Sequence, residues 1–446
     1  MQQRLTSQNI LRTALCAAWF AMPAARAADA ETAAPDGGWQ LNGQITYVDQ
    51  YHPAFNAPYS GPNSLKPAAA DNETADVTLY AGHRLWRGAE FWINPEVDQG
   101  FGLSDTLGIA GFPSGEAYKI GADSPYLRIP RVFVRQVFDL GGAMQSVDAA
   151  PNQLAGSAAA DNLTLTIGKF SVVDVFDTNS YAHDPRGDFL NWAVIDGGAF
   201  DYAADSWGFT NGAALEWNTG DWSVRGGLFQ MSDVPNAKIA GYRFHDFMSV
   251  AELERRTKWG GHPGKIKLLA YADRADMGRY ADALALAAAS GGTPSTARVR
   301  QYATSTGLVV NLEQEVAQNV GVFVRASAHD GRYEAYEFAD IDRSLSAGVS
   351  LQGALWGRAG DKAGIAAVSN ALSGDALQYF AAGGIGILIG DGRLDYAREQ
   401  IAEAYYALKL MDKLTLTADC QRIVDPAYNR DRGPVSVYAV RVHAEF

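Results

Sequence analysis

The sequence predicts an all-β protein, a transmembrane up-and-down antiparallel β-barrel, from its alternating hydrophobicity, its repeated strand-length segments and its composition. The alternation is clearest at the C-terminus, where residues 436–446 read SVYAVRVHAEF. Every second residue there is apolar or aromatic (Phe446, Ala444, Val442, Val440, Tyr438), and the residues between them are Glu445, His443, Arg441 and Ala439. A strand with this period-two pattern suits a barrel wall that has lipid outside and water inside. A soluble edge strand could show the same alternation, so the rest of the chain is needed to distinguish a membrane barrel from a soluble sheet.

About sixteen alternating segments follow one another along the chain, each close to the length of a tilted membrane-spanning strand. They cover residues 39–50, 74–83, 88–98, 130–140, 162–170, 209–217, 221–231, 247–256, 264–273, 302–312, 320–328, 344–354, 362–370, 397–409, 413–423 and 435–446. An even number places both termini on the periplasmic side, as in bacterial outer-membrane barrels. Sixteen strands leave a lumen wide enough for an aqueous channel.

The connections are predicted to alternate between short periplasmic turns and long extracellular loops. Short turns are expected at residues 84–87, 218–220, 260–263, 314–319, 357–360 and 411–413, and long loops after Tyr51, Gly100, Ser171 and Arg274. Residues 141–161 are the exception, because this stretch is long where the scheme requires a short turn. Its many small residues predict a flexible segment.

The N-terminus resembles an export signal. Arg4 and Arg12 precede an apolar run from Ala14 to Met22, and Ala25-Arg26-Ala27 offers a small-residue cleavage site. Residues 1–27 are therefore interpreted as a cleaved signal peptide, and residues 28–446 as a single barrel domain in the cell outer membrane. Of the two cysteines, Cys16 leaves with the signal, so Cys420 has no partner for an intramolecular disulfide.

Composition excludes several other classes of protein. The formal net charge of -13 disfavours nucleic-acid binding, which requires a basic face. The 46 glycines, 20 tyrosines and 10 tryptophans suit a β-rich chain with aromatic girdles. The seven histidines show no metal-ligand spacing, so neither a metal nor a cofactor is predicted.

Strand parity predicts which side chains face the lumen. In residues 88–97 the inward set includes Glu90, Trp92 and Glu96, and in the next strand it includes Arg131 and Arg135. Adjacent strands are thus expected to place two carboxylates beside two guanidinium groups. Later strands add inward charged residues, among them Glu403 and Arg441. For each such residue, bracing of the wall by ion pairs is the alternative to contact with a passing solute.

The longest loop, residues 172–208, is predicted to fold inward and narrow the pore. A sugar presents hydroxyls at its edge and C–H groups on its face, so its path requires hydrogen-bonding side chains beside aromatic planes. Tyr181, Trp192 and Trp92 are the predicted planes, and Asp184 and Arg186 join the strand residues as predicted polar partners. An ion pair that only fixes the loop is the alternative for Asp184 and Arg186, and packing under the loop is the alternative for Trp192.

Several stretches resemble the carbohydrate-selective porins of the OprB type. They are GKFSVVDVFDTNSYAHDPRGDFLNWAVIDGGAFDYAADSWG from Gly168, VAELERR from Val250, PGKIKLLAY from Pro263, MGRYADAL from Met277, EQIAEAYYALKL from Glu399 and DCQRIVDPAYNRDRGPVSVYAVRVHAEF from Asp419. The resemblance implies a sixteen-stranded outer-membrane barrel that passes sugars by diffusion. The expected partners are mono- and oligosaccharides, outer-membrane lipid and lipopolysaccharide, and the barrel assembly machinery through the C-terminal strand that ends at Phe446. A homotrimer is a further possibility.

The predicted function is therefore passive, carbohydrate-selective diffusion of mono- and oligosaccharides through a water-filled barrel, without covalent chemistry. A general or anion-biased porin is the alternative in the same class, and the arginines favour it. A barrel enzyme, such as an outer-membrane lipase or protease, requires a Ser-His or Asp-His pair on the outer rim. A soluble secreted β-protein that binds sugar is the third alternative, and salt alone would extract it from membranes.

Overall fold

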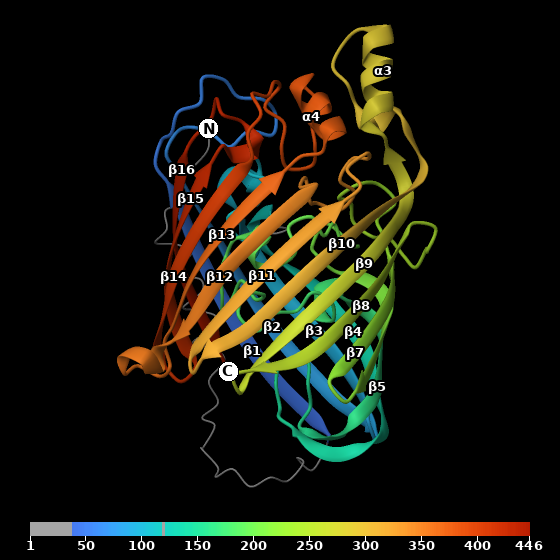
Figure 1. Ribbon diagram of the computed structural model, residues 1–446, viewed down its shortest axis with the longest axis vertical. Helices are drawn as coiled ribbons and strands as arrows, with labels where there is room; N and C mark the ends of the chain where they lie inside the picture. Colours follow the sequence, from blue (N-terminus) through green and yellow to red (C-terminus); the bar gives the residue numbers. More distant parts are fainter. Residues whose placement is uncertain (1–37, 118–120) are drawn as a thin grey trace. The chain divides into compact units, whose positions relative to one another are not determined.

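Sixteen antiparallel strands form a closed barrel in the computed structural model, which describes residues 38–117 and 121–446 (Figure 1). Each strand pairs with its neighbours in sequence, and β1 pairs with β16 to close the barrel. The predicted number of strands and their antiparallel order are confirmed, whereas the predicted signal peptide, residues 1–27, lies outside the described residues. The strands are β1 (Trp39–His52), β2 (Ala70–Trp86), β3 (Ala89–Phe101), β4 (Gly121–Val147), β5 (Gly156–Phe170), β6 (Thr210–Thr219), β7 (Trp222–Gln230), β8 (Phe247–Trp259), β9 (His262–Gly278), β10 (Arg300–Ala317), β11 (Val320–His329), β12 (Arg343–Gln352), β13 (Lys362–Ala371), β14 (Glu399–Met411), β15 (Leu414–Val424) and β16 (Val435–Glu445).

The two faces of each strand differ as the alternation predicts. On β16, Tyr438 and Val440 are 49% and 46% exposed on the outer surface, whereas Arg441 is buried inside the barrel. The C-terminal Phe446 lies against Gly43 of β1, and their backbones exchange two hydrogen bonds of 2.8 and 2.9 Å. A Cβ atom at Gly43 would lie 2.3 Å from the Phe446 ring, so the ring packs against the backbone of β1 at a position that has no side chain.

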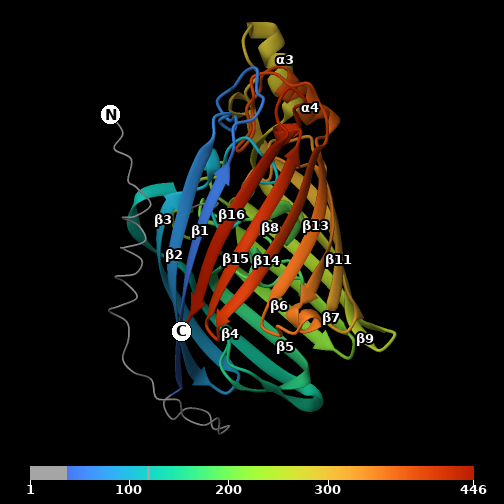
Figure 2. The same ribbon diagram turned by 90° about the vertical axis from the view of Figure 1, so that its left-hand side faces the viewer.

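Short turns lie at the end of the barrel that carries the C-terminus, and long loops with α3 and α4 lie at the other end (Figure 1). The prediction that residues 141–161 form a flexible segment is wrong. Here β4 and β5 pair as far as Val147 and Gly156, with register shifts between Asp139 and Gly141 and between Gly141 and Met144. This hairpin reaches beyond its neighbours in both views (Figure 2). Its tip turns back into the lumen, where Leu154 is buried.

Within residues 38–117 and 121–446, helices occur only in the connections between strands. The α-helices are α2 (Trp192–Ile195), α3 (Tyr280–Ser290) and α4 (Gly374–Ala381), and the 3₁₀ turns are η1 (Leu103–Thr106), η2 (Val172–Asp174), η3 (Thr296–Arg298), η4 (Gly353–Trp356) and η5 (Pro426–Tyr428). The Ser373 side chain caps α4 by accepting a hydrogen bond from Ala376 N–H. Among residues 38–117 and 121–446, no helix has the length and apolar character needed to cross a membrane.

The hydrophobic core lies inside the barrel. Aromatic side chains of the connection between β5 and β6 meet aromatic side chains on the inner wall: Phe176 contacts Phe229 of β7, and Phe189 contacts Tyr405 of β14. Both loop residues are fully buried. The lumen is thus partly filled by a packed loop, and any path for a solute has to pass beside it.

Candidate functional site

Residues 172–208, between β5 and β6, lie within the barrel and are bound to the inner wall by charged side chains. Glu403 of β14 accepts hydrogen bonds from the backbone N–H groups of Leu190 and Asn191, at 2.5 and 3.2 Å. Arg441 of β16 donates to the Asp188 carbonyl at 2.9 Å. These bonds satisfy polar loop backbone that is buried away from water, as buried peptide groups require.

The same loop is bound on a second side by β9, β10 and β11. The Arg325 guanidinium forms a fully buried ion pair with Asp177, at 3.2 Å, and donates to the Val194 carbonyl at 2.8 Å. Asn311 donates to the Asp177 carboxylate at 2.6 Å, and Lys267 donates to the Thr178 carbonyl. We call Lys267, Arg325, Glu403 and Arg441 the anchor residues, because each bonds to the backbone of the loop.

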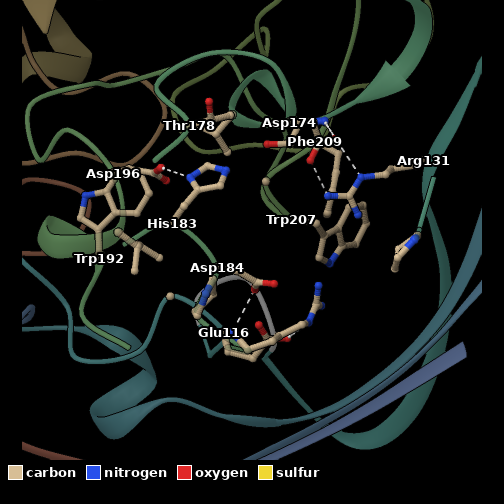
Figure 3. Close-up of a pocket in the computed structure, with 18 of the residues that line it drawn as sticks. Glu116, Arg131, Asp174, Thr178, His183, Asp184, Trp192, Asp196, Trp207 and Phe209 are labelled. Atoms are coloured by element: carbon tan, nitrogen blue, oxygen red, sulfur yellow. Dashed lines mark hydrogen bonds and ion pairs between the residues drawn. The ribbon is translucent and has the colours of Figure 1, made fainter. Parts of the chain in front are cut away.

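The loop and the inner wall of β1, β2, β4 and β16 line a cavity of about 480 Å³ (Figure 3). Side chains from the loop, from β4 and from the connection after β3 point into this space. The lining combines carboxylates, guanidinium groups and aromatic rings. We call this space the central cavity.

Three guanidinium groups line the central cavity, and each is paired with carboxylates. Arg131 of β4 binds Asp174 through two parallel hydrogen bonds of 2.8 and 2.6 Å, a geometry that fixes both side chains. Arg128, also on β4, pairs with Glu96 at 2.6 Å and with Asp98.

Arg186 comes from the loop and completes the charged group. Its guanidinium lies 2.9 Å from Glu116, 3.4 Å from Asp76 and 3.6 Å from Glu96. Five carboxylates therefore face three guanidinium groups (Asp76, Glu96, Asp98, Glu116 and Asp174 against Arg128, Arg131 and Arg186). This part of the wall has no surplus of positive charge.

Loop carboxylates next to these arginines titrate below their ordinary range. Burial alone would raise the pKa of Asp174, but the adjacent Arg131 guanidinium outweighs burial and lowers that pKa. Burial would also raise the pKa of Asp184, but the positive charge of Arg186 outweighs burial and lowers that pKa. Both side chains are therefore ionised near neutral pH, and they present hydrogen-bond acceptors to the central cavity.

Aromatic rings form the rest of the lining. The Arg131 guanidinium lies over the Phe209 ring, with its central carbon 4.8 Å from the ring centroid. Trp207 lies beside Phe209 in Figure 3. Both residues are partly exposed, and the Lys238 ammonium lies over the Trp207 ring, 4.3 Å from its centroid. Trp192, across the cavity, stacks on Phe112 with centroids 5.5 Å apart and meets Phe338 edge-on at 4.7 Å. It is only 3% exposed, and its Nε1–H has no hydrogen-bond partner among the described residues.

Four of the residues predicted from the sequence meet at the central cavity: Arg131, Asp184, Arg186 and Trp192. Glu96 lies directly behind them, but its partners are Arg128 and Arg186, in place of the expected Arg131.

Glu90, Trp92 and Arg135 form a separate group around the tip of the β4–β5 hairpin. Trp92 donates to Glu90 at 2.8 Å, and Arg135 lies 4.0 Å from Glu90 and donates to the Asn152 carbonyl at 2.6 Å. Trp92 is fully buried and offers no open ring face. These three residues hold the hairpin tip inside the lumen.

The remaining three predicted residues lie elsewhere. Glu403 and Arg441 are anchor residues, and both are 1% exposed. Tyr181 lines a different cavity near the short turns. The predicted set therefore divides among the central cavity, the hairpin tip, the loop anchors and this second cavity.

Sequence reasoning missed Glu116, Arg128, Trp207 and Phe209, which line the central cavity, and also Asp76 and Asp98, which are buried behind it as partners of Arg186 and Arg128. Asp98 shares the inward parity of Glu96 and would have been found by extending that pattern two residues. Trp207 and Phe209 carry no periodic signal, because they lie where the loop meets β6.

Comparison with known proteins identifies the family. A family model described as the carbohydrate-selective porin, OprB family, matches residues 63–446. The chain belongs to this family. A comparison with curated protein sequences gave no significant match.

Solved structures support the fold of this OprB-family porin. The high-pH structure of Pseudomonas putida OprB superimposes with a TM-score of 0.70 and 17% sequence identity, covering 92% of this chain and 94% of that one. The outer-membrane channel DcaP of Acinetobacter baumannii matches with a TM-score of 0.51 and 10% identity, covering 92% of this chain and 97% of that one. The OprB-type resemblance and the barrel fold predicted from the sequence are thereby confirmed, and family membership implies the outer membrane as the location. The end with short turns and the C-terminus is then periplasmic.

Proposed function

We propose that the central cavity is the selective constriction through which this porin passes neutral mono- and oligosaccharides. Its support is one arrangement of side chains: the partly exposed rings of Trp207 and Phe209 lie next to the paired charges of Arg131 and Asp174. A sugar ring placed there stacks its C–H face on an aromatic plane while its hydroxyls exchange hydrogen bonds with ionised groups.

Diffusion through this site requires weak and reversible contacts. The guanidinium groups are already held by carboxylates, so they donate to a sugar without having to be desolvated from bulk water. A solute must bind well enough to enter and weakly enough to leave. The arrangement therefore favours selection by size, stacking and hydrogen bonding, with no covalent step.

An anion-biased porin is the second candidate, and the charge count argues against it. An anion would have to displace a carboxylate from Arg128, Arg131 or Arg186, since five carboxylates surround these three groups. We expect neutral sugars to pass in preference to their negatively charged analogues.

Single-channel conductance in a planar bilayer tests this proposal, with glucose, maltose and a longer maltodextrin titrated in turn. We expect saturable block of the ion current, and a rise of about three- to tenfold in the half-blocking concentration for Trp207→Ala, because one stacking plane is lost. Trp217→Ala is the matched control, because Trp217 lies on the outer face of β6 and is 47% exposed. A wild-type current that no sugar reduces would establish a general porin instead.

The remaining expectations concern the path to the membrane and the assembled state. We infer that residues 1–27 are removed on export, that the strand ending at Phe446 engages the barrel assembly machinery, and that the outer surface contacts lipid and lipopolysaccharide. N-terminal sequencing of the membrane-extracted protein tests the cleavage. A homotrimer is tested by the mass of the detergent-solubilised protein, and an enzymatic role by hydrolysis of lipid or peptide substrates.

A further inference from the structure

A second cavity, of about 540 Å³, lies at the periplasmic end of the lumen and is separate from the central cavity. It falls within the range of about 300–1,000 Å³ that is usual for small-molecule sites. Its lining comes from the β8–β9 hairpin, from β10 and from loop residues Ser180 and Tyr181. We call it the exit cavity.

Tyr181 is held rigidly in this cavity. The neighbouring Ser180 donates to Glu313 of β10 through its backbone N–H at 2.7 Å and through its hydroxyl at 2.8 Å. The Tyr181 backbone N–H donates to the Asn179 side chain at 2.9 Å. The ring therefore has a fixed position on the inner wall.

One side of the Tyr181 ring lies directly on Gly321 of β11. A Cβ atom at position 321 would lie 2.0 Å from the nearest ring carbon, so the ring can occupy this place only above a glycine. Tyr181 is partly exposed, and its hydroxyl has no hydrogen-bond partner among the described residues. The ring thus presents an apolar plane and an unused polar group to the exit cavity.

Polar and charged side chains line the same cavity as this plane. The Lys265 ammonium lies 2.8 Å from Glu313 and 3.3 Å from the Ser180 hydroxyl, and its side chain is 33% exposed. Arg256, from the same hairpin, also lines the cavity, and its guanidinium donates to Ser223, Gly220 and Trp222. An aromatic plane beside ionised hydrogen-bonding groups repeats the chemistry of the central cavity on the periplasmic side of the loop.

We propose that the exit cavity is a second saccharide-binding site, in which a pyranose ring stacks on Tyr181 and its hydroxyls bind Lys265 and Ser180. The inference rests on the proposed passage of sugars through the central cavity. A sugar that leaves the constriction is then rebound before release into the periplasm. A sugar that enters from the periplasm meets this site first.

The test is block of the single-channel current by maltose added to one side of the bilayer at a time. For Tyr181→Ala we expect the half-blocking concentration from the periplasmic side to rise about three- to tenfold, and the effect of extracellular maltose to change less. Tyr181→Phe keeps the plane and should remain close to wild type. Gly321→Ala displaces the ring without removing it, and should reproduce the result of Tyr181→Ala.

Folding of each variant is checked by heat-modifiable migration in gels, and Gly321→Ala provides the test if Tyr181→Ala does not fold. Titrations of Tyr181→Ala or Gly321→Ala that superimpose on wild type from both sides would overturn the exit site alone. An absence of maltose block in the wild-type channel would overturn the proposed function itself. The two failures are therefore distinguishable.

Discussion

The two halves of the inner wall contact the inserted loop through different kinds of bond. On the β9 to β16 half, the anchor residues bond to the loop backbone and are almost fully buried. On the β2 to β4 half, the wall meets the loop mainly through pairs of side chains, such as Arg131 with Asp174 and Asp76 with Arg186, and one side chain, Arg128, also donates to a loop carbonyl, that of Trp207, at 3.1 Å. The first half holds the loop in place, and the second faces it across the central cavity.

The structural role of an inward charged side chain in this barrel therefore depends on the group to which it bonds. A charge bonded to buried backbone cannot be removed without leaving peptide groups unsatisfied. A charge bonded to another side chain at a water-filled cavity leaves a partner that water can solvate. Removal of an anchor should therefore affect the fold of the loop, whereas removal of a cavity charge should affect selectivity.

The largest effect is expected for Arg325→Met. This substitution leaves the Asp177 carboxylate buried without its cation, a change that usually costs about 3–5 kcal/mol. The loop should loosen, which raises the single-channel conductance and exposes residues 172–208 to protease. Conductance and the rate of proteolysis measure both consequences.

The control for this experiment is Arg332→Met. Arg332 pairs with Asp330 in an extracellular connection where its side chain is 53% exposed, so its loss should cost at most about 1 kcal/mol. Equal conductance and equal protease resistance in both variants would show that the loop does not depend on its buried anchors.

A smaller effect, on selectivity, is expected for Arg131→Ala. The substitution leaves Asp174 without its bidentate partner at the central cavity. The unpaired carboxylate should shift the permeability ratio toward cations by about two- to threefold, as measured by the reversal potential in a salt gradient. Arg87→Ala is the matched control, because Arg87 pairs with Asp139 at a periplasmic turn and is 89% exposed. A ratio unchanged in Arg131→Ala would place the selective step outside the central cavity.

The barrel wall was predictable from the sequence because alternation is a local signal. Sixteen strands and the inward parity of Glu90, Trp92 and Glu96 follow from a period of two. The alternation fails in β4, where the pairing with β3 shifts register between Asn94 and Glu96. Arg128 and Arg131 are three residues apart and both line the cavity, which strict alternation does not permit.

The loop was predictable only in its length and in the types of residue it carries. Parity places Glu403 and Arg441 in the lumen, but their role as anchors depends on a loop more than 200 positions away. No local pattern reports such a contact. Trp207 could not be predicted for the same reason, because it lines the cavity through its position beside β4 and its sequence neighbours give no sign of that position.

The smallest effect concerns a pair within the loop itself, His183 and Asp196, whose side chains lie 3.3 Å apart. Burial alone would lower the pKa of His183, but the hydrogen bond to Asp196 and its charge raise that pKa overall; Arg325 opposes this shift and Asp177 adds to it. A histidine with a raised pKa stabilises the folded loop fully below its ordinary pKa of about 6.5. That contribution is lost as the pH rises through the raised value.

Open-channel current noise and proteolysis of residues 172–208 should therefore increase from pH 6 to pH 9 in the wild-type protein. In His183→Gln the uncharged side chain does not titrate, so the same measurements should vary less with pH. His245→Gln is the control, because His245 pairs with Asp246 in an extracellular connection and its side chain is 67% exposed. Because the His183 side chain is 25% exposed whereas that of Arg325 is 1% exposed, the loss of His183 should loosen the loop less than the loss of Arg325. If His183→Gln retained the full wild-type pH dependence, the titrating group would lie elsewhere, and the anchors alone would fix the loop.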